Sequence, residues 1–288
     1  MLVGLPLNSL VKKAWRKEVT KFDVSIDPRK FDLSIEEIIA IADGEDVDAR
    51  LITNASELSF GPFEEQDIKR ELSAEKSILL VQGLEQYFKS VRMLIASYFD
   101  FIPAWQLDDV MGSVNYNSTS CGAHFDQYDV FLLQHTGEKK WHFDEMIHCD
   151  EDLDENSELR LLKHFSPTNE VIAREGDLIY VPPGVGHHGQ AAEASITLSI
   201  GIRNPTPLEI LGDFSSFLMS EQSNQAPLSS KLFSGEDEIS DKFIKEIRAY
   251  LTNACSTENI EDWVGCYSTR LSEPGYIEPN EPPSLKSK

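Results

Sequence analysis

Residues 123–141, "AHFDQYDVFLLQHTGEKKW", indicate the fold. An apolar strand runs through "DVFLLQ", turns at residues 135–137 and returns through "EKKW", which is typical of a β-hairpin. The even positions of the first strand share one face, and they are Asp126, Tyr128, Val130 and Leu132. The apolar members place this face toward the interior, and it carries His124 and Asp126 with it. These two residues are therefore candidate metal ligands.

The tripeptide His-Phe-Asp occurs again at residues 142–144, so the tripeptide alone does not identify a site. On the returning strand, Lys139, Trp141 and Phe143 share one face, and His142 and Asp144 lie on the other. Large aromatic side chains belong inside. The sequence therefore predicts that Lys139 points inward and that His142 and Asp144 face solvent.

A third ligand is offered by residues 175–189, "EGDLIYVPPGVGHHG". A Gly-Asp turn, a buried strand and a Pro-Pro-Gly turn bring His187 to the start of the next strand. His188 is the alternative, but adjacent strand residues point in opposite directions, so only one of them can bind. Two histidines and one carboxylate form the facial set that holds non-haem Fe(II) and leaves positions open for a cosubstrate and O₂. The candidate set is His124, Asp126 and His187.

The strand "SITLSIGI" (195–202) alternates between two kinds of side chain. Its apolar face, Ile196, Leu198, Ile200 and Ile202, must be covered by another part of the chain. Its small hydroxyl residues, Ser195, Thr197 and Ser199, then line a cavity with polar contents. Thr197 is our candidate on this strand for binding a polar cosubstrate.

Short strands separated by Gly and Pro turns between about 109 and 203 predict a sandwich or jelly roll with flanking helices. Ser34 and Glu37 form a capping-box pattern that predicts a helix within residues 30–45. A strand at 78–81 is followed by a helical apolar stripe. We expect α/β elements that pack on the barrel (1–90), a double-stranded β-helix (91–205), a helical region (206–270) and a Pro-rich tail (271–288).

The composition limits the partners. The 288 residues carry a net charge of −23, which repels phosphates and argues against direct binding to nucleic acid. The charge would attract a basic partner, although on charge alone an ordinary acidic surface is the better explanation. Four scattered cysteines fit a reducing compartment, and no apolar run is long enough for a bilayer. We therefore expect a cytoplasmic protein without membrane contact.

The two long stretches, 123–141 and 175–189, together resemble the bacterial ribosomal oxygenases of the JmjC (cupin-like) family. The shorter stretches "VDARL", "FGPF", "LLVQ" and "AWQLDDVM" extend the resemblance over most of residues 1–280. The resemblance implies a hydroxylase that uses Fe(II), 2-oxoglutarate and O₂. It also implies an arginine of the large-subunit ribosomal protein numbered sixteen as the target.

Position by position, the resemblance implies iron ligands at His124, Asp126 and His187. It implies that Lys139 binds the distal carboxylate of 2-oxoglutarate and that Ser113 lies near it. Relatives often have arginine in place of Lys139, and lysine offers a single point donor rather than a planar fork. The resemblance further implies a homodimer formed through the helices after the barrel. Relatives usually continue into a C-terminal winged-helix domain, whereas this sequence ends at Lys288.

The acidic run at residues 148–158 is most simply a solvated loop, and its carboxylates would attract a basic ribosomal protein. Asp109, Asp129 and Glu145 are candidate partners for the guanidinium of a substrate arginine. Two other functions stay open: a cupin enzyme without 2-oxoglutarate, such as an isomerase or a direct dioxygenase, and a non-catalytic cupin that serves as a binding module. The inward Lys139 and the complete metal set favour the oxygenase.

Overall fold

The computed structural model describes residues 7–53, 57–74, 77–116, 120–191, 193–221 and 241–269. The chain divides into two compact units, one containing residues up to Arg203 and the other spanning Asn204–Leu271. The predicted Pro-rich tail lies outside the described residues.

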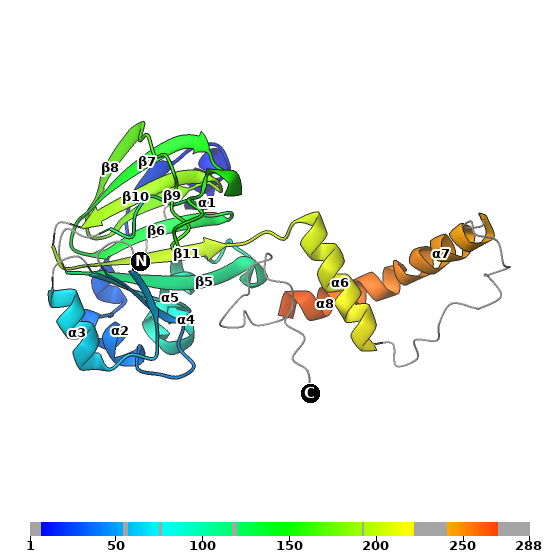
Figure 1. Cartoon of the computed structure of the whole chain (residues 1–288), viewed down its shortest axis with the longest axis horizontal. Helices are drawn as coiled ribbons and strands as arrows, with labels where there is room; N and C mark the ends of the chain where they lie inside the picture. Colours follow the sequence, from blue (N-terminus) through cyan, green and yellow to red (C-terminus); the bar gives the residue numbers. More distant parts are fainter. Residues whose placement is uncertain are drawn as a thin grey trace. The chain divides into compact units, whose positions relative to one another are not determined.

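The first unit is built on two antiparallel sheets (Figure 1). The large sheet has the strand order β1-β9-β6-β11-β5-β4-β2-β3, and the small sheet has the order β10-β7-β8. The strands are β1 Thr20–Ser25, β2 Ala49–Thr53, β3 Glu57–Phe60, β4 Ser77–Val81, β5 Leu107–Asn115, β6 Asp129–Thr136, β7 Lys139–Ile147, β8 Asn169–Ala173, β9 Asp177–Val181, β10 Val185–Ala191 and β11 Ser195–Ile202. This architecture confirms the predicted mostly-β fold of the jelly-roll class, and it places strands from the first ninety residues in the same large sheet.

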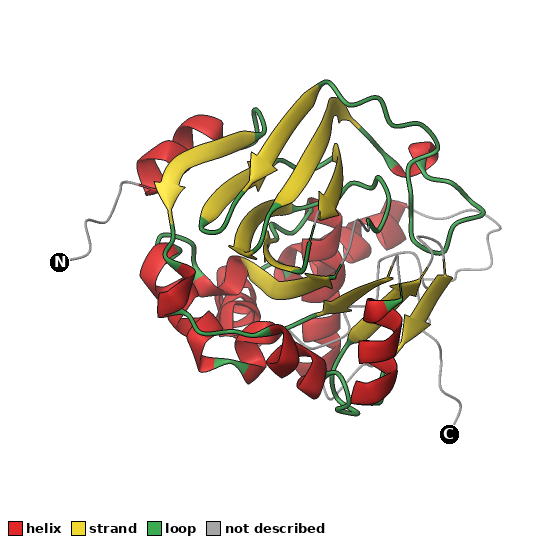
Figure 2. Ribbon diagram, turned by 90° about the vertical axis from the view of Figure 1, so that its left-hand side faces the viewer, coloured by secondary structure: helices red, strands yellow, loops and turns green. Residues whose placement is uncertain are grey.

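Helices α2 to α5 cover one face of the large sheet, as Figures 1 and 2 both show. The helices of this unit are α1 Leu7–Ala14, α2 Ile35–Ile41, α3 Glu65–Ser73, α4 Leu84–Tyr87 and α5 Lys89–Tyr98, with 3-10 turns η1 Pro28–Lys30, η2 Ala104–Gln106 and η3 Asp150–Asp152. The predicted cap of α2 is confirmed: the Glu37 amide donates to Ser34 Oγ (3.2 Å) and the Ser34 amide donates to Glu37 Oε2 (2.8 Å). The helical stripe after residue 84 is two helices rather than one, because Phe88 is extended between them.

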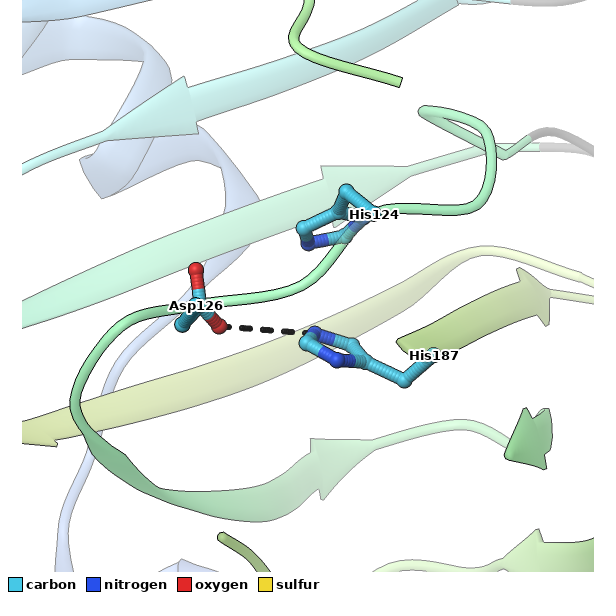
Figure 3. A group of neighbouring side chains, drawn as sticks. All are labelled: His124, Asp126 and His187. Carbon is cyan, nitrogen blue, oxygen red and sulfur yellow. Dashed lines mark ion pairs between the residues drawn. The ribbon is translucent and has the colours of Figure 1, made fainter. Parts of the chain in front are cut away.

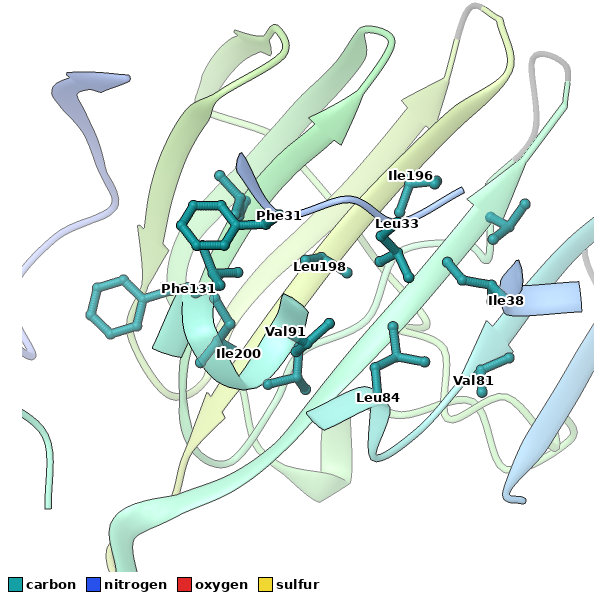
Figure 4. Close-up of a cluster of buried hydrophobic side chains, with 14 of the residues drawn as sticks. Phe31, Leu33, Ile38, Val81, Leu84, Val91, Phe131, Ile196, Leu198 and Ile200 are labelled. Atoms are coloured by element: carbon teal, nitrogen blue, oxygen red, sulfur yellow. The ribbon is translucent and has the colours of Figure 1, made fainter. Parts of the chain in front are cut away.

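The core beneath these helices confirms the prediction for the strand at 195–202 (Figure 4). Its apolar side chains, Ile196, Leu198, Ile200 and Ile202, are each at most 1% exposed and pack with Leu84 and Val91 from the helices. Gly112 on β5 allows this close approach, since a Cβ there would lie 2.6 Å from Leu84 Cδ1.

The opposite face of the large sheet packs on the small sheet. Val130 and Leu132 from β6 meet Trp141 and Phe143 from β7 in a second buried cluster. The interior between the sheets is therefore reached by alternate residues of β5, β6, β7, β10 and β11, the segments from which the sequence predicted the site.

The second unit contains α6 Pro207–Glu221, α7 Asp241–Ala254 and α8 Thr257–Thr269. Trp263 links α8 to α6: its Nε1 donates a hydrogen bond to Asp213 Oδ1 (2.7 Å), and its ring makes an edge-on contact with Phe214. Among the helices that the structure describes, none is both long and apolar enough to cross a bilayer.

Candidate metal centre

Backbone pairing brings the two predicted histidines together. His124 and His187 form an isolated antiparallel bridge, in which the His124 amide donates to the His187 carbonyl (3.1 Å) and the His187 amide donates back (2.7 Å). The expectation that His124 and Asp126 lie on one continuous strand with Val130 is wrong, since β6 begins only at Asp129. The Gly184 amide instead binds the Asp126 carbonyl (2.8 Å) and holds this irregular segment beside β10.

The three candidate side chains converge (Figure 3). One ligand atom from each of His124, Asp126 and His187 lies within 4.8 Å of the others, and His187 Nε2 is 3.5 Å from Asp126 Oδ2. His187 Nδ1 is 3.1 Å from the Val185 carbonyl, and His124 Nδ1 is 3.2 Å from the Gly122 carbonyl. A proton on each Nδ1 leaves Nε2 as a lone-pair donor, which is how metal-binding histidines are oriented. The donor set fits a divalent metal such as Fe(II).

Burial and neighbouring charges shift the pKa values of the two histidines in opposite directions. Burial lowers the pKa of His187 to about 4, so its ring is neutral at neutral pH, as a ligand must be. Burial also acts to lower the pKa of His124, but Cys121 and Asp126 outweigh it and raise this pKa to about 9. A metal bound here would therefore displace a proton from His124.

A buried cation lies in the same cavity as this triad. Lys139 is 4% exposed, and its Nζ is 3.4 Å from both Ser113 Oγ and Asn115 Oδ1. The ammonium also lies 4.9 Å from the centre of the Trp141 ring. Burial lowers the pKa of Lys139 to about 8. The structure thus brings together Lys139 and Ser113, the pair that the resemblance indicated for a carboxylate.

Two polar residues of this region were not predicted from the sequence. Asn115 is fully buried beside Lys139, and Gln134 accepts a hydrogen bond at Oε1 from Thr197 Oγ1 (3.0 Å). The signal was present, because Asn115 has the parity of Ser113 on β5 and Gln134 continues the even positions of β6.

A cavity of ≈ 80 Å³ contains both the triad and Lys139. Thr197 and Ser199 line it, which confirms the polar face of β11, whereas Ser195 is fully buried and is absent from the lining. The cavity adjoins an outer pocket of ≈ 330 Å³ that shares His124, Asp126 and Tyr128 with it. The outer pocket also includes Asp150 and Glu158 from the acidic run.

The prediction that Asp144 faces solvent is wrong. Asp144 is 2% exposed, accepts hydrogen bonds from the Ser166 and Met146 amides, and lies 3.3 Å from His148 Nε2. His142 is also largely covered, with 20% of its side chain exposed. The two residues do lie on the predicted face of β7, opposite Trp141 and Phe143. The segment after β7, however, folds over this face and supplies polar partners for Asp144. Neither residue lines the cavity that holds the triad.

The three carboxylates suggested for a substrate cation lie in different places. Asp109 lines the inner cavity. Asp129 is buried and already occupied by Arg16 and by Tyr180, whose hydroxyl donates to Asp129 Oδ1 (2.6 Å). Glu145 is exposed and lines neither pocket. Of the three, only Asp109 is placed to meet a side chain near the triad.

The two-layer antiparallel barrel with an inward His-Asp-His set defines a double-stranded β-helix protein with a candidate metal centre. Residues 94–210 match the family described as JmjC domain. This part of the chain is thus similar to JmjC domains, and the chain as a whole is similar in sequence to bacterial ribosomal oxygenases.

Among the relatives is the ribosomal protein uL16 3-hydroxylase of Escherichia coli (strain K12). It is 28% identical over 296 residues, which cover 95% of this chain and 74% of that protein. A probable ribosomal oxygenase of Haemophilus influenzae is 35% identical over 178 residues, which cover 59% of this chain and 43% of that protein. The X-ray structure of E. coli YcfD superposes with a TM-score of 0.76 at 25% identity and covers 97% of this chain and 76% of that chain. A structure of YcfD in complex with cobalt and 2-oxoglutarate gives a TM-score of 0.75 at 25% identity and covers 97% and 75%.

Removing any one of the three candidate ligands should abolish metal binding. We expect His124→Ala, Asp126→Ala and His187→Ala each to weaken Co²⁺ binding by more than the roughly 10–100-fold that an outer-shell change causes. Isothermal titration calorimetry measures the affinity. His188→Ala is the matched control, because it lies on the same strand and points away from the cavity. Full affinity in any of the three variants would remove that residue from the site.

Proposed function

We propose that this chain is an Fe(II)- and 2-oxoglutarate-dependent protein hydroxylase that acts on a large-subunit ribosomal protein. The observation that carries the proposal is the placement of a His-Asp-His triad and a buried lysine in one cavity. The names of the relatives, a ribosomal protein uL16 3-hydroxylase and a probable ribosomal oxygenase, support the substrate class. The YcfD complex with cobalt and 2-oxoglutarate supports the cofactors.

In this proposal each side chain has one task. His124, Asp126 and His187 hold the metal on one side and leave its other positions open. Lys139 neutralises the distal carboxylate of 2-oxoglutarate, with Ser113 and Thr197 as hydroxyl partners. The iron supplies activation of O₂, by which an unreactive C–H bond is hydroxylated. The apolar walls, Val130, Leu132 and Trp141, exclude water from the cavity.

The buried Lys139 argues for a cosubstrate. A lysine held at 4% exposure has its charge penalised by burial, and an anion in the adjoining cavity would relieve that penalty. A cupin enzyme that needs no 2-oxoglutarate, or a cupin used only for binding, gives this residue no task.

The cationic substrate is proposed to be an arginine side chain that reaches Asp109. Burial, together with the neighbouring Asp108 and Glu85, raises the pKa of Asp109 to about 7. A guanidinium in the cavity would favour the ionised carboxylate and pair with it. Asp150 and Glu158 at the outer pocket add negative charge along the approach. A ribosomal substrate also implies that the chain works in the cytoplasm.

Binding of 2-oxoglutarate should depend on the proton of Lys139. The pKa of Lys139 is lowered to about 8, so raising the pH above this value removes the positive charge that the carboxylate needs. At saturating Co²⁺ we expect the dissociation constant of 2-oxoglutarate to rise about tenfold per pH unit above pH 8. Lys139→Arg is the control, because guanidinium keeps its charge and should flatten the profile. A flat profile in the wild-type protein contradicts the proposed role.

The reaction itself is tested with Fe(II), ascorbate, 2-oxoglutarate and the isolated large-subunit ribosomal protein numbered sixteen. Intact-mass analysis should show the gain of one oxygen atom, and fragment spectra should place it on an arginine. Asp109→Asn should lower kcat/KM for this substrate by about 10–100-fold, the loss of a charge-assisted hydrogen bond. Its uncoupled consumption of 2-oxoglutarate without substrate should be unchanged. Oxygen gain on a different basic protein alone would disprove the arginine target but retain the hydroxylase.

The helical unit is proposed to form a homodimer. Large apolar side chains are exposed on all three of its helices, among them Leu208 (79%), Leu211 (59%), Ile244 (50%) and Leu251 (56%). Apolar surface of this kind marks protein interfaces, and two-fold symmetry is the commonest arrangement.

We expect light scattering at micromolar concentration to return twice the 32.5 kDa of one chain. The double variant Leu208→Glu/Leu251→Glu should shift the mass to that of the monomer, whereas the exposed Met146→Glu on the barrel should not. A wild-type mass of one chain would refute the dimer.

A further inference from the structure

One glycine lies directly behind two side chains that line the cavity, Lys139 and Trp141, and is explained neither by a turn nor by its backbone conformation. Gly189 lies in the middle of β10, opposite Trp141 of β7, and its φ angle is outside the left-handed range that favours glycine. A Cβ built on it would lie 2.7 Å from Lys139 Cε, 2.8 Å from Trp141 Cζ3 and 2.9 Å from Trp141 Cη2. Glycine is therefore present because two side chains of the neighbouring strand occupy the space of its side chain.

The strand register shows in which direction the Lys139 side chain runs. His187 pairs with Phe143, Gly189 with Trp141 and Ala191 with Lys139, and paired residues of an antiparallel ladder share a face. Lys139 thus starts opposite Ala191, but its Cε contacts the position of Gly189, one pair nearer to His187. The lysine stem leans along the wall toward the triad.

Trp141 lies between the two ends of this wall. Its ring centre is 4.9 Å from Lys139 Nζ and 5.9 Å from the centre of the His187 ring. Being 5% exposed and in ring contact with Phe143, the indole cannot easily turn aside. Gly189 and Trp141 together limit how far the ammonium can lie from the metal ligands.

We propose that Gly189 and Trp141 are positioning residues that set the distance between the Lys139 ammonium and the triad, and so select the chain length of the dicarboxylate cosubstrate. The inference rests on the proposed function, in which a 2-oxo dicarboxylate spans from the metal to Lys139. A longer or shorter diacid would place its distal carboxylate away from the ammonium. The expected preference is for 2-oxoglutarate over its one-carbon-longer homologue, 2-oxoadipate.

Gly189→Ala tests the inference because the lysine stem is the part that can move. A methyl group at 189 meets the flexible end of Lys139 at 2.7 Å and the edge of the indole at 2.8 Å, so the lysine stem is displaced and the ring or β10 must also shift slightly. Binding of 2-oxoglutarate at saturating Co²⁺ should weaken about tenfold, and binding of 2-oxoadipate should weaken less, so that the selectivity ratio falls. Co²⁺ affinity should not change.

A second, compensating substitution distinguishes a positioning role of Gly189 from a general loss of stability. In Trp141→Phe/Gly189→Ala the smaller ring frees space for the lysine stem, and 2-oxoglutarate affinity should recover at least partly. Gln190→Ala, the exposed neighbour on the same strand, and Gly212→Ala, where a Cβ meets nothing within 4 Å, are the matched controls and should bind like the wild type. Should Gly189→Ala fail to fold, Trp141→Phe alone must still lower the selectivity ratio. An unchanged ratio there overturns the inference.

A measurement on the protein without cosubstrate distinguishes failure of the proposed chain-length selection from failure of the proposed function. In protein labelled with 5-fluorotryptophan, the ¹⁹F resonance of Trp141, assigned by its loss in Trp141→Phe, should shift in Gly189→Ala before any ligand is added. If this resonance shifts but both diacids bind as in the wild type, the selection of cosubstrate length is refuted. If the wild-type protein with Co²⁺ binds neither diacid, the proposed function itself fails.

Discussion

The reciprocal pair of backbone hydrogen bonds between His124 and His187 is the interaction on which the site depends. The segment that carries His124 and Asp126 is irregular, so no strand ladder fixes the direction of its side chains. The bridge to His187 replaces that ladder at one point, and the Gly184 amide bound to the Asp126 carbonyl adds a second. Because β10 is also paired with β7 over its length, the same bridge sets the triad relative to Lys139 and Trp141.

This arrangement concentrates unlike charges where water is scarce. Burial lowers the pKa of Lys139 and raises that of Asp109, so the charge of each group is penalised in the absence of a partner. An anion beside Lys139 and a cation beside Asp109 would stabilise both charges at once. The two ends of the cavity are therefore suited to ligands of opposite sign, which is the combination that a dicarboxylate cosubstrate and a basic substrate present.

Strand parity accounts for what could be predicted from the sequence. It placed Lys139 and Thr197 in the cavity and Ile196 under the helices, since period-two alternation survives local irregularity. The capping box at Ser34 was equally predictable, because all of its hydrogen bonds lie between Ser34 and Glu37. Parity failed at Asp144, where the correct face was identified but its exposure was not, because a segment more than twenty residues downstream covers it. The extended Phe88 between α4 and α5 likewise depends on tertiary contacts that one-dimensional periodicity does not contain.

The choice of lysine at position 139 has a structural consequence for its surroundings. An arginine would bring a planar fork that fixes its own orientation on a carboxylate, whereas an ammonium on a four-carbon stem has many rotamers and gains no such alignment. The walls must then supply the order that the side chain lacks. Gly189 leaves space for the stem, and the Trp141 ring lies beside the ammonium. The cation is thus positioned by packing rather than by its own geometry, which ties the identity of Gly189 to that of Lys139.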